Sequence, residues 1–102
     1  MMFDLAQFTK KTFSMFSGQD ERVTMVCNNQ SIGIAIDRFG KDITLMKEDD
    51  EHVRFSTVVT ISPQFYGWMT GVGKQIRIKK PDWVRIEYQE YLEEVLANYT
   101  TE

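Results

Sequence analysis

The sequence predicts an α+β domain of the ferredoxin-like class, in which a βαββαβ chain forms a four-stranded antiparallel sheet with two helices on one face. A short N-terminal helix precedes this unit and an additional C-terminal helix follows it. Three observations predict the class: four segments with strand character, two apolar segments of helical spacing between them, and the order in which they occur. The chain of 102 residues has room for one such domain with one core.

We expect residues 1–21 to form a short helix and a linker, and residues 22–102 to form the domain. Asp4 is a suitable N-terminal cap for the helix, and Gly18 is a suitable end. Between them, five side chains recur at helical spacing: Leu5, Phe8, Thr12, Phe13 and Phe16.

The first strand is expected at residues 22–27, and the segment after it fits two structures. Alternation typical of a strand is present in Ile32, Ile34 and Ile36. A helical face is also present, made of Ile32, Ala35, Ile36 and Phe39. We predict a helix, because Ser31 is a good N-cap residue and Gly40 stands where a C-terminal glycine belongs.

Two further strands, at residues 42–47 and 52–62, are expected to pair through the acidic turn at residues 48–51. The second strand has the clearest alternation in the chain. One of its faces is apolar and carries Val53, Phe55, Thr57, Val59 and Ile61.

The second helix of the unit is expected to begin at Ser62 and Pro63, with Ser62 as the cap. Its apolar stripe consists of Phe65, Trp68, Met69 and Val72. A short strand at residues 75–79 follows, and Pro81 then opens the last helix. A longer stripe runs along that helix: Val84, Tyr88, Tyr91, Leu92, Val95 and Tyr99.

Composition narrows the class of function. The net charge of −3 argues against a general nucleic-acid binder, which is normally basic. Cys27 is the only cysteine, so no internal disulfide can form, and a reducing cytoplasm is expected. The sequence contains no apolar run of membrane-spanning length and no recognisable signal peptide, which also indicates a cytoplasmic protein.

The residues that usually carry catalysis are scarce. His52 and Cys27 lie on separate predicted strands, so we interpret them as a solvated histidine and a buried thiol rather than a nucleophile pair. The acidic turn lacks the ligand spacing of a calcium loop. Gly67, Gly71 and Gly73 do not stand between a strand and a helix, as a phosphate loop requires. We therefore expect no catalytic residue, no metal site and no cofactor.

A surface is the better candidate for function. In the ferredoxin-like strand order 4-1-3-2, the sheet face away from the helices carries Arg22, Thr24, Val26, Arg54, Ser56, Val58, Arg77 and Lys79. Its basic members, which are Arg22, Arg54, Arg77 and Lys79, are candidates for holding phosphates or single-stranded nucleic acid. The alternative is a solvated sheet face without a ligand.

The aromatic residues are expected to be mainly core, because they fall on helical stripes. Tyr66 and Trp83 lie off these stripes, so we predict that they contact a partner.

The second half of the chain resembles a known module. Its motifs are Ser62-Pro63-Gln64-Phe65-Tyr66-Gly67-Trp68-Met69, then Ile76-Arg77-Ile78, then Lys80-Pro81-Asp82-Trp83-Val84-Arg85, and a helix from Tyr88 to Tyr99. This resembles the C-terminal extension (WCX) domain of WYL-domain (DeoR/YafY-like) bacterial transcriptional regulators. The segment from Phe3 to Gly18 is similar to the linker that leaves the WYL domain, and Asp37-Arg38-Phe39-Gly40 fits the end of the family's first helix.

The resemblance implies a role in dimerisation and in sensing an effector, either a nucleotide or single-stranded nucleic acid. Members of the family carry a winged helix-turn-helix, a WYL domain and then this extension. Here no recognition helix precedes Phe3, and Trp68 and Tyr66 are not the Trp-Tyr-Leu signature. The implied partners are the WYL domain of the same or a partner subunit and, in the full-length protein, a second copy in a homodimer.

Two other functions compete with this hypothesis. One is a stand-alone single-stranded RNA-binding domain, although the open face lacks the stacking aromatics that such sheets use. The other is an acyl-phosphate hydrolase, which would need a glycine-flanked loop leading into an arginine, and we find none.

Overall fold

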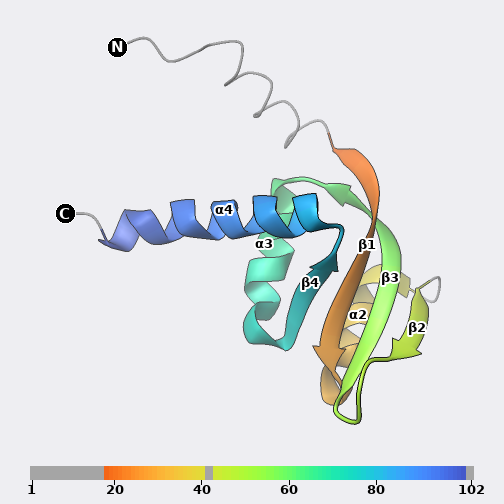
Figure 1. Ribbon diagram of the computed structural model, residues 1–102. Coiled ribbons are helices and arrows are strands. Elements are labelled where there is room, and N and C mark those ends of the chain that lie inside the picture. Colours follow the sequence, from red (N-terminus) through yellow and green to blue (C-terminus); the bar gives the residue numbers. More distant parts are fainter. Residues whose placement is uncertain (1–17, 41–42, 101–102) are drawn as a thin grey trace, which may run out of the picture.

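The computed structural model describes residues 18–40 and 43–100, and it has an α+β architecture with a four-stranded antiparallel sheet (Figure 1). The helix predicted between Asp4 and Phe16 lies outside the described residues. In chain order the elements are β1 (Gln19–Asn28), a 3₁₀ turn (Asn29–Ser31), α2 (Ile32–Phe39), β2 (Thr44–Lys47), β3 (His52–Ile61), α3 (Pro63–Val72), a 3₁₀ turn (Gly73–Gln75), β4 (Ile76–Lys80) and α4 (Asp82–Thr100).

The strands lie in the order β2-β3-β1-β4, and each neighbouring pair is antiparallel. The two long strands, of 10 residues each, are therefore in the middle, and the two short ones form the edges. β1 pairs with β3 along its whole length, from Gln19 opposite Ile61 to Asn28 opposite His52. The arrangement is compatible with a ferredoxin-like fold.

The prediction of a helix between Ser31 and Gly40 is confirmed, but Ser31 does not act as expected. Its hydroxyl makes no cap hydrogen bond and lies instead 2.6 Å from Asn28 Oδ1 and 2.9 Å from Gln75 Oε1. Gly40 ends α2 with a φ of 81°, in the region that favours glycine. The serine thus ties the start of α2 to the segment before β4.

The core lies between the sheet and the helices α2 and α3, with Val23 and Met25 fully buried at its centre. Its other buried members are Cys27, Ala35, Phe55, Val59, Ile61, Phe65, Tyr66, Met69, Ile76, Ile78 and Val84. These are mainly alternate residues of the strands, as period-two patterning requires.

The start of α3 follows the prediction: the Ser62 hydroxyl accepts a hydrogen bond from the Phe65 N–H at 3.2 Å. Trp68, predicted to be core, is only partly buried, and its ring makes a T-shaped contact with the Phe39 ring at a centroid distance of 5.0 Å. The centre of the buried face is shifted toward Tyr66, because α4 packs on a second side of α3.

The last helix, α4, begins against the body of the domain and then projects away from it (Figure 1). Val84 in its first turn is fully buried, whereas Tyr99 near its end is 81 % exposed. None of the helices in the described part of the chain is long and apolar enough to cross a membrane.

Candidate functional site

The sheet face that points away from α2 and α3, which we call the open face, carries one row of residues across all four strands. Register places Met46 opposite Arg54, Arg54 opposite Val26, and Val26 opposite Arg77. Although Val26 is on this outward face, it is only 2 % exposed. The long side chains around it therefore cover the middle of the open face.

The carboxylate of Glu48, which was predicted only as part of an acidic turn, lies among these cations. Glu48 Oε2 is 2.8 Å from Lys79 Nζ, and Glu48 Oε1 is 3.8 Å from Arg54 Nε. The Lys79 hydrogen bond lowers the pKa of Glu48, partial desolvation opposes this, and the charges of Lys79, Arg54 and Arg77 lower it further. Glu48 directly follows β2, and Lys79 is in β4. Because β3 and β1 lie between these two edge strands, the ion pair spans the open face.

The turn that carries Glu48 is fixed by its own hydrogen bonds. The Glu48 N–H donates to the His52 carbonyl at 3.0 Å, and His52 Nδ1 lies 2.8 Å from Asp49 Oδ1. The His52 contact is the main cause that lowers the pKa of Asp49. His52 is thus part of the turn, on the side of β3 opposite the core.

Three of the four predicted cations come together, and Arg22 does not. Arg22 lies opposite Val58, four residues along β1 from Val26, or about 13 Å away at ordinary strand spacing. Arg77 is exposed on the open face. Its charge acts on Glu48, but no hydrogen bond or ion pair joins its guanidinium to another of residues 18–40 and 43–100. We call Arg54, Arg77 and Lys79 the cation cluster.

The prediction that Tyr66 contacts a partner is wrong, because its side chain is fully buried. It packs against Tyr88 and Tyr91 of α4 and donates a hydrogen bond to Glu87 Oε1. Burial, and then the Glu87 carboxylate, raise the pKa of Tyr66 far above its usual range. Trp83 is 39 % exposed in the first turn of α4, where a partner can reach it.

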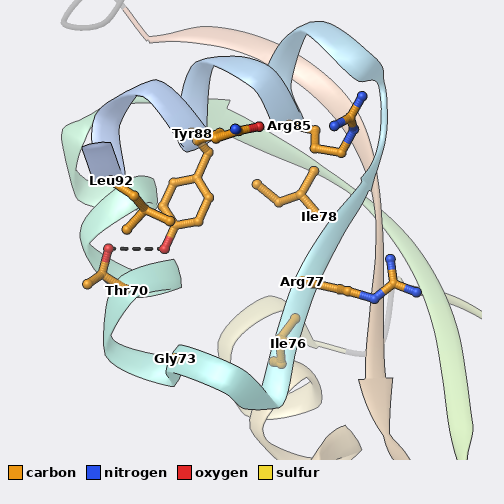
Figure 2. A pocket seen from close by; sticks show the side chains of 9 residues that line it. Thr70, Gly73, Ile76, Arg77, Ile78, Arg85, Tyr88 and Leu92 are labelled. Carbon is orange, nitrogen blue, oxygen red and sulfur yellow. Dashed lines mark hydrogen bonds between the residues drawn. The ribbon is translucent and has the colours of Figure 1, made fainter. Parts of the chain in front are cut away.

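A cleft of about 460 Å³ lies between α3, β4 and α4 (Figure 2). Ile78 of β4 faces the Tyr88 ring across it, and the Tyr88 hydroxyl lies 3.1 Å from Thr70 Oγ1. Arg77 borders the cleft, but its guanidinium points away from it, toward β1. The lining consists of Thr70, Gly73, Ile76, Arg77, Ile78, Arg85, Tyr88, Gln89 and Leu92.

Cys27 and His52 do not form a nucleophile pair. Cys27 is buried in the core, and this burial raises the pKa of its thiol. His52 is on the opposite side of the sheet and contacts Asp49.

No protein-family model matches the chain, and no curated protein matches it either.

Proposed function

We propose that the chain is a regulatory and assembly domain of a WYL-type bacterial transcription regulator, that it works in the cytoplasm, and that it catalyses no reaction. It packs on a WYL domain through α4 and helps to sense an effector, a nucleotide or single-stranded nucleic acid, through the open face. The proposal includes the finer assignment of the α+β fold as ferredoxin-like. The observation that carries it is the apolar stripe of α4, which continues beyond the body of the domain.

The stripe changes from buried to exposed along the helix. Val84 is fully buried and Tyr88 is half-buried against Tyr66, whereas Tyr99 is 81 % exposed. Leu96, which lies one turn after Leu92 and widens the stripe at its outer end, is 58 % exposed. Leu92 and Val95 lie between these extremes, at 38 % and 37 % exposure. Large apolar side chains that line up on several turns of one helix are typical of a surface that another protein covers.

The charges of α4 favour a different domain over a second α4 as the occupant. The helix carries a single cation, Arg85, and five carboxylates: Asp82, Glu87, Glu90, Glu93 and Glu94. Two such helices side by side would bring like charges together. We therefore place the WYL domain of the same or a partner subunit on this stripe. If the WYL domain belongs to the partner subunit, its contact with α4 joins two copies of the regulator.

The cleft beside α4 extends the same surface. Tyr88 and Leu92 belong both to the stripe and to the cleft lining. A partner helix that lies along the stripe can place an apolar side chain between Tyr88 and the isoleucines of β4. Such an anchored side chain is a common source of binding energy at interfaces.

The test is a binding experiment with the regulator's own WYL domain. The coding sequence in front of Met1, or a neighbouring gene, should encode a helix-turn-helix and a WYL domain that purify in complex with this chain. Leu96→Glu should weaken the complex by about tenfold or more, since a buried charge at an interface costs at least about 1.4 kcal/mol.

Ile86→Glu is the matched control, because Ile86 is 44 % exposed and lies on the other side of α4. The proposal is wrong if no such domain is encoded, or if Leu96→Glu and Ile86→Glu have equal effects.

Stand-alone binding of single-stranded RNA has less support. The described part of the open face carries no phenylalanine, tyrosine or tryptophan side chain on which a base could stack, and its one imidazole, His52, contacts Asp49.

A further inference from the structure

The Glu48 carboxylate satisfies the cation cluster only in part. Lys79 is within hydrogen-bond distance of it, but Arg54 Nε is 3.8 Å away and no hydrogen bond joins them. Within the described ranges, the Arg54 side chain donates a single hydrogen bond, to the Met46 sulfur, a weak acceptor, at 3.4 Å. Among the described residues, neither of the two arginine guanidinium groups therefore donates a hydrogen bond to an oxygen acceptor.

The charge of the cluster is also incompletely balanced. Arg54, Arg77 and Lys79 contribute three positive charges and Glu48 one negative charge, which leaves +2 in a chain whose net charge is −3. The side chains of Lys79 and Arg54 are each 30 % exposed, so a ligand from solvent can reach them. Partial burial keeps their attraction for an anion stronger than on a fully solvated surface.

A phosphate monoester fits this arrangement better than a carboxylate does. It carries up to two negative charges and three terminal oxygens, and guanidinium groups bind such oxygens in pairs. A tetrahedral dianion at the centre of the cluster can accept hydrogen bonds from Lys79, Arg54 and Arg77 together. A planar carboxylate held at one side by Lys79 does not reach all three.

We propose that the cation cluster binds a terminal phosphate group, and that Glu48 is a built-in competitor which occupies the site until a phosphate displaces it. The inference rests on the proposed function, in which the open face senses the effector. It specifies that the effector carries a terminal phosphate and that Glu48 occupies the site when no phosphate is bound. Glu48 can leave as a side chain, because the turn behind it is fixed separately by the hydrogen bonds of Asp49 and His52.

The experiment measures phosphate binding by the whole chain with NMR amide shifts. The probes are inorganic phosphate, adenosine 5′-monophosphate and adenosine, which separate a free phosphate from a nucleotide and from the base alone. Glu48→Gln should bind both phosphate probes about three- to tenfold more tightly than wild type, the effect expected for removing one nearby like charge. Adding Arg77→Gln should abolish this gain, and adenosine should bind neither protein.

Asp50→Asn is the matched control. It removes a carboxylate from the same turn, but the Asp50 side chain is 95 % exposed and pairs with Lys47 away from the cluster. The inference is overturned if Asp50→Asn gains as much affinity as Glu48→Gln, or if the phosphate shifts do not centre on Arg54, Arg77 and Lys79.

The amide spectrum also reports whether each variant is folded. If Glu48→Gln is unfolded, Glu48→Asp is used in its place, because the shorter side chain withdraws its carboxylate from Lys79. The affinity of Glu48→Asp for phosphate must then be higher than that of Asp50→Asn. Assembly through α4 is tested by a different variant and readout, so failure of phosphate binding leaves that proposal intact, and the reverse also holds.

Discussion

Replacing Tyr66 by Phe tests the packing of α4 on α3 through a single hydroxyl group. The Tyr66 side chain is fully buried between the two helices and donates a hydrogen bond to the Glu87 carboxylate. Tyr66→Phe keeps the ring and its contacts with Tyr88 and Tyr91 but removes this bond. A hydrogen bond to a charged group contributes about 1.5–3 kcal/mol, and half-buried Glu87 can recover part of this from water, so we expect a loss of about 1–2 kcal/mol.

The same substitution has a signature at high pH. Burial and Glu87 raise the pKa of Tyr66 above the value of 10.0 that it has when unfolded. Its contribution is therefore complete below pH 10 and falls as the pH rises, because the unfolded chain releases the proton first. The slope is about 1.4 kcal/mol per pH unit for one proton, which integrates to about 1 kcal/mol between pH 10 and pH 11.

Urea denaturation of both proteins from pH 7 to pH 11 is the assay. The wild type should lose its advantage over Tyr66→Phe above pH 10, and the difference between the two proteins isolates Tyr66 because it is the only residue changed. Two stability curves that stay parallel through this range would show that Tyr66 is not held protonated in the folded state, and the packing argument would fail.

Two further substitutions test positions at the edge of the core. Gly18→Ala should destabilise the domain by about 1–3 kcal/mol, because Gly18 has a φ of 76° and an added Cβ would lie 2.6 Å from Thr60 Cγ2; equal melting temperatures would refute this strain. Trp68→Ala should cost about 2–4 kcal/mol, less than for a fully buried tryptophan, because Trp68 is only partly buried against Phe39. Trp83→Ala, at an exposed position, should cost less than about 1 kcal/mol when both variants are compared by thermal melting. A larger loss of stability for Trp83→Ala than for Trp68→Ala would contradict the burial of the two side chains described above.

Local sequence patterns predicted most of the helices and strands, because alternation, helical spacing and capping residues all act within a few positions of the chain. The helix α2 was recognised against a competing strand pattern by the glycine at its end, and Gly40 does adopt a positive φ there. The start of β1 was missed: residues 19–21 are polar, and they become a strand only because β3 offers Val59 to Ile61 as pairing partners. Gln19 and its partner Ile61 are about 40 residues apart in the sequence, so a local pattern cannot predict that they pair.

The sequence predicted that the cations of the open face lie together, but it did not predict that the Glu48 carboxylate lies among them. Strand alternation alone put Arg54, Arg77 and Lys79 on one face. Glu48 continues the alternation of Thr44 and Met46, which could have placed it there too, but its meeting with Lys79 depends on how the edge strands approach across the sheet. Tyr66 was misassigned for a similar reason, since a helical stripe drawn for α3 alone contains no information about α4.

The unequal lengths of the strands also bear on how the protein avoids aggregation. Both edges of the sheet are short, four residues in β2 and five in β4, and β4 presents Arg77, Lys79 and Lys80. Short and charged edges are poor templates for an added strand. The ten-residue strands β1 and β3 are paired on both sides where the short strands lie beside them, at residues 24–27 of β1 and 53–56 of β3. The short, charged edge strands therefore protect this half of the sheet from the addition of a strand from another chain.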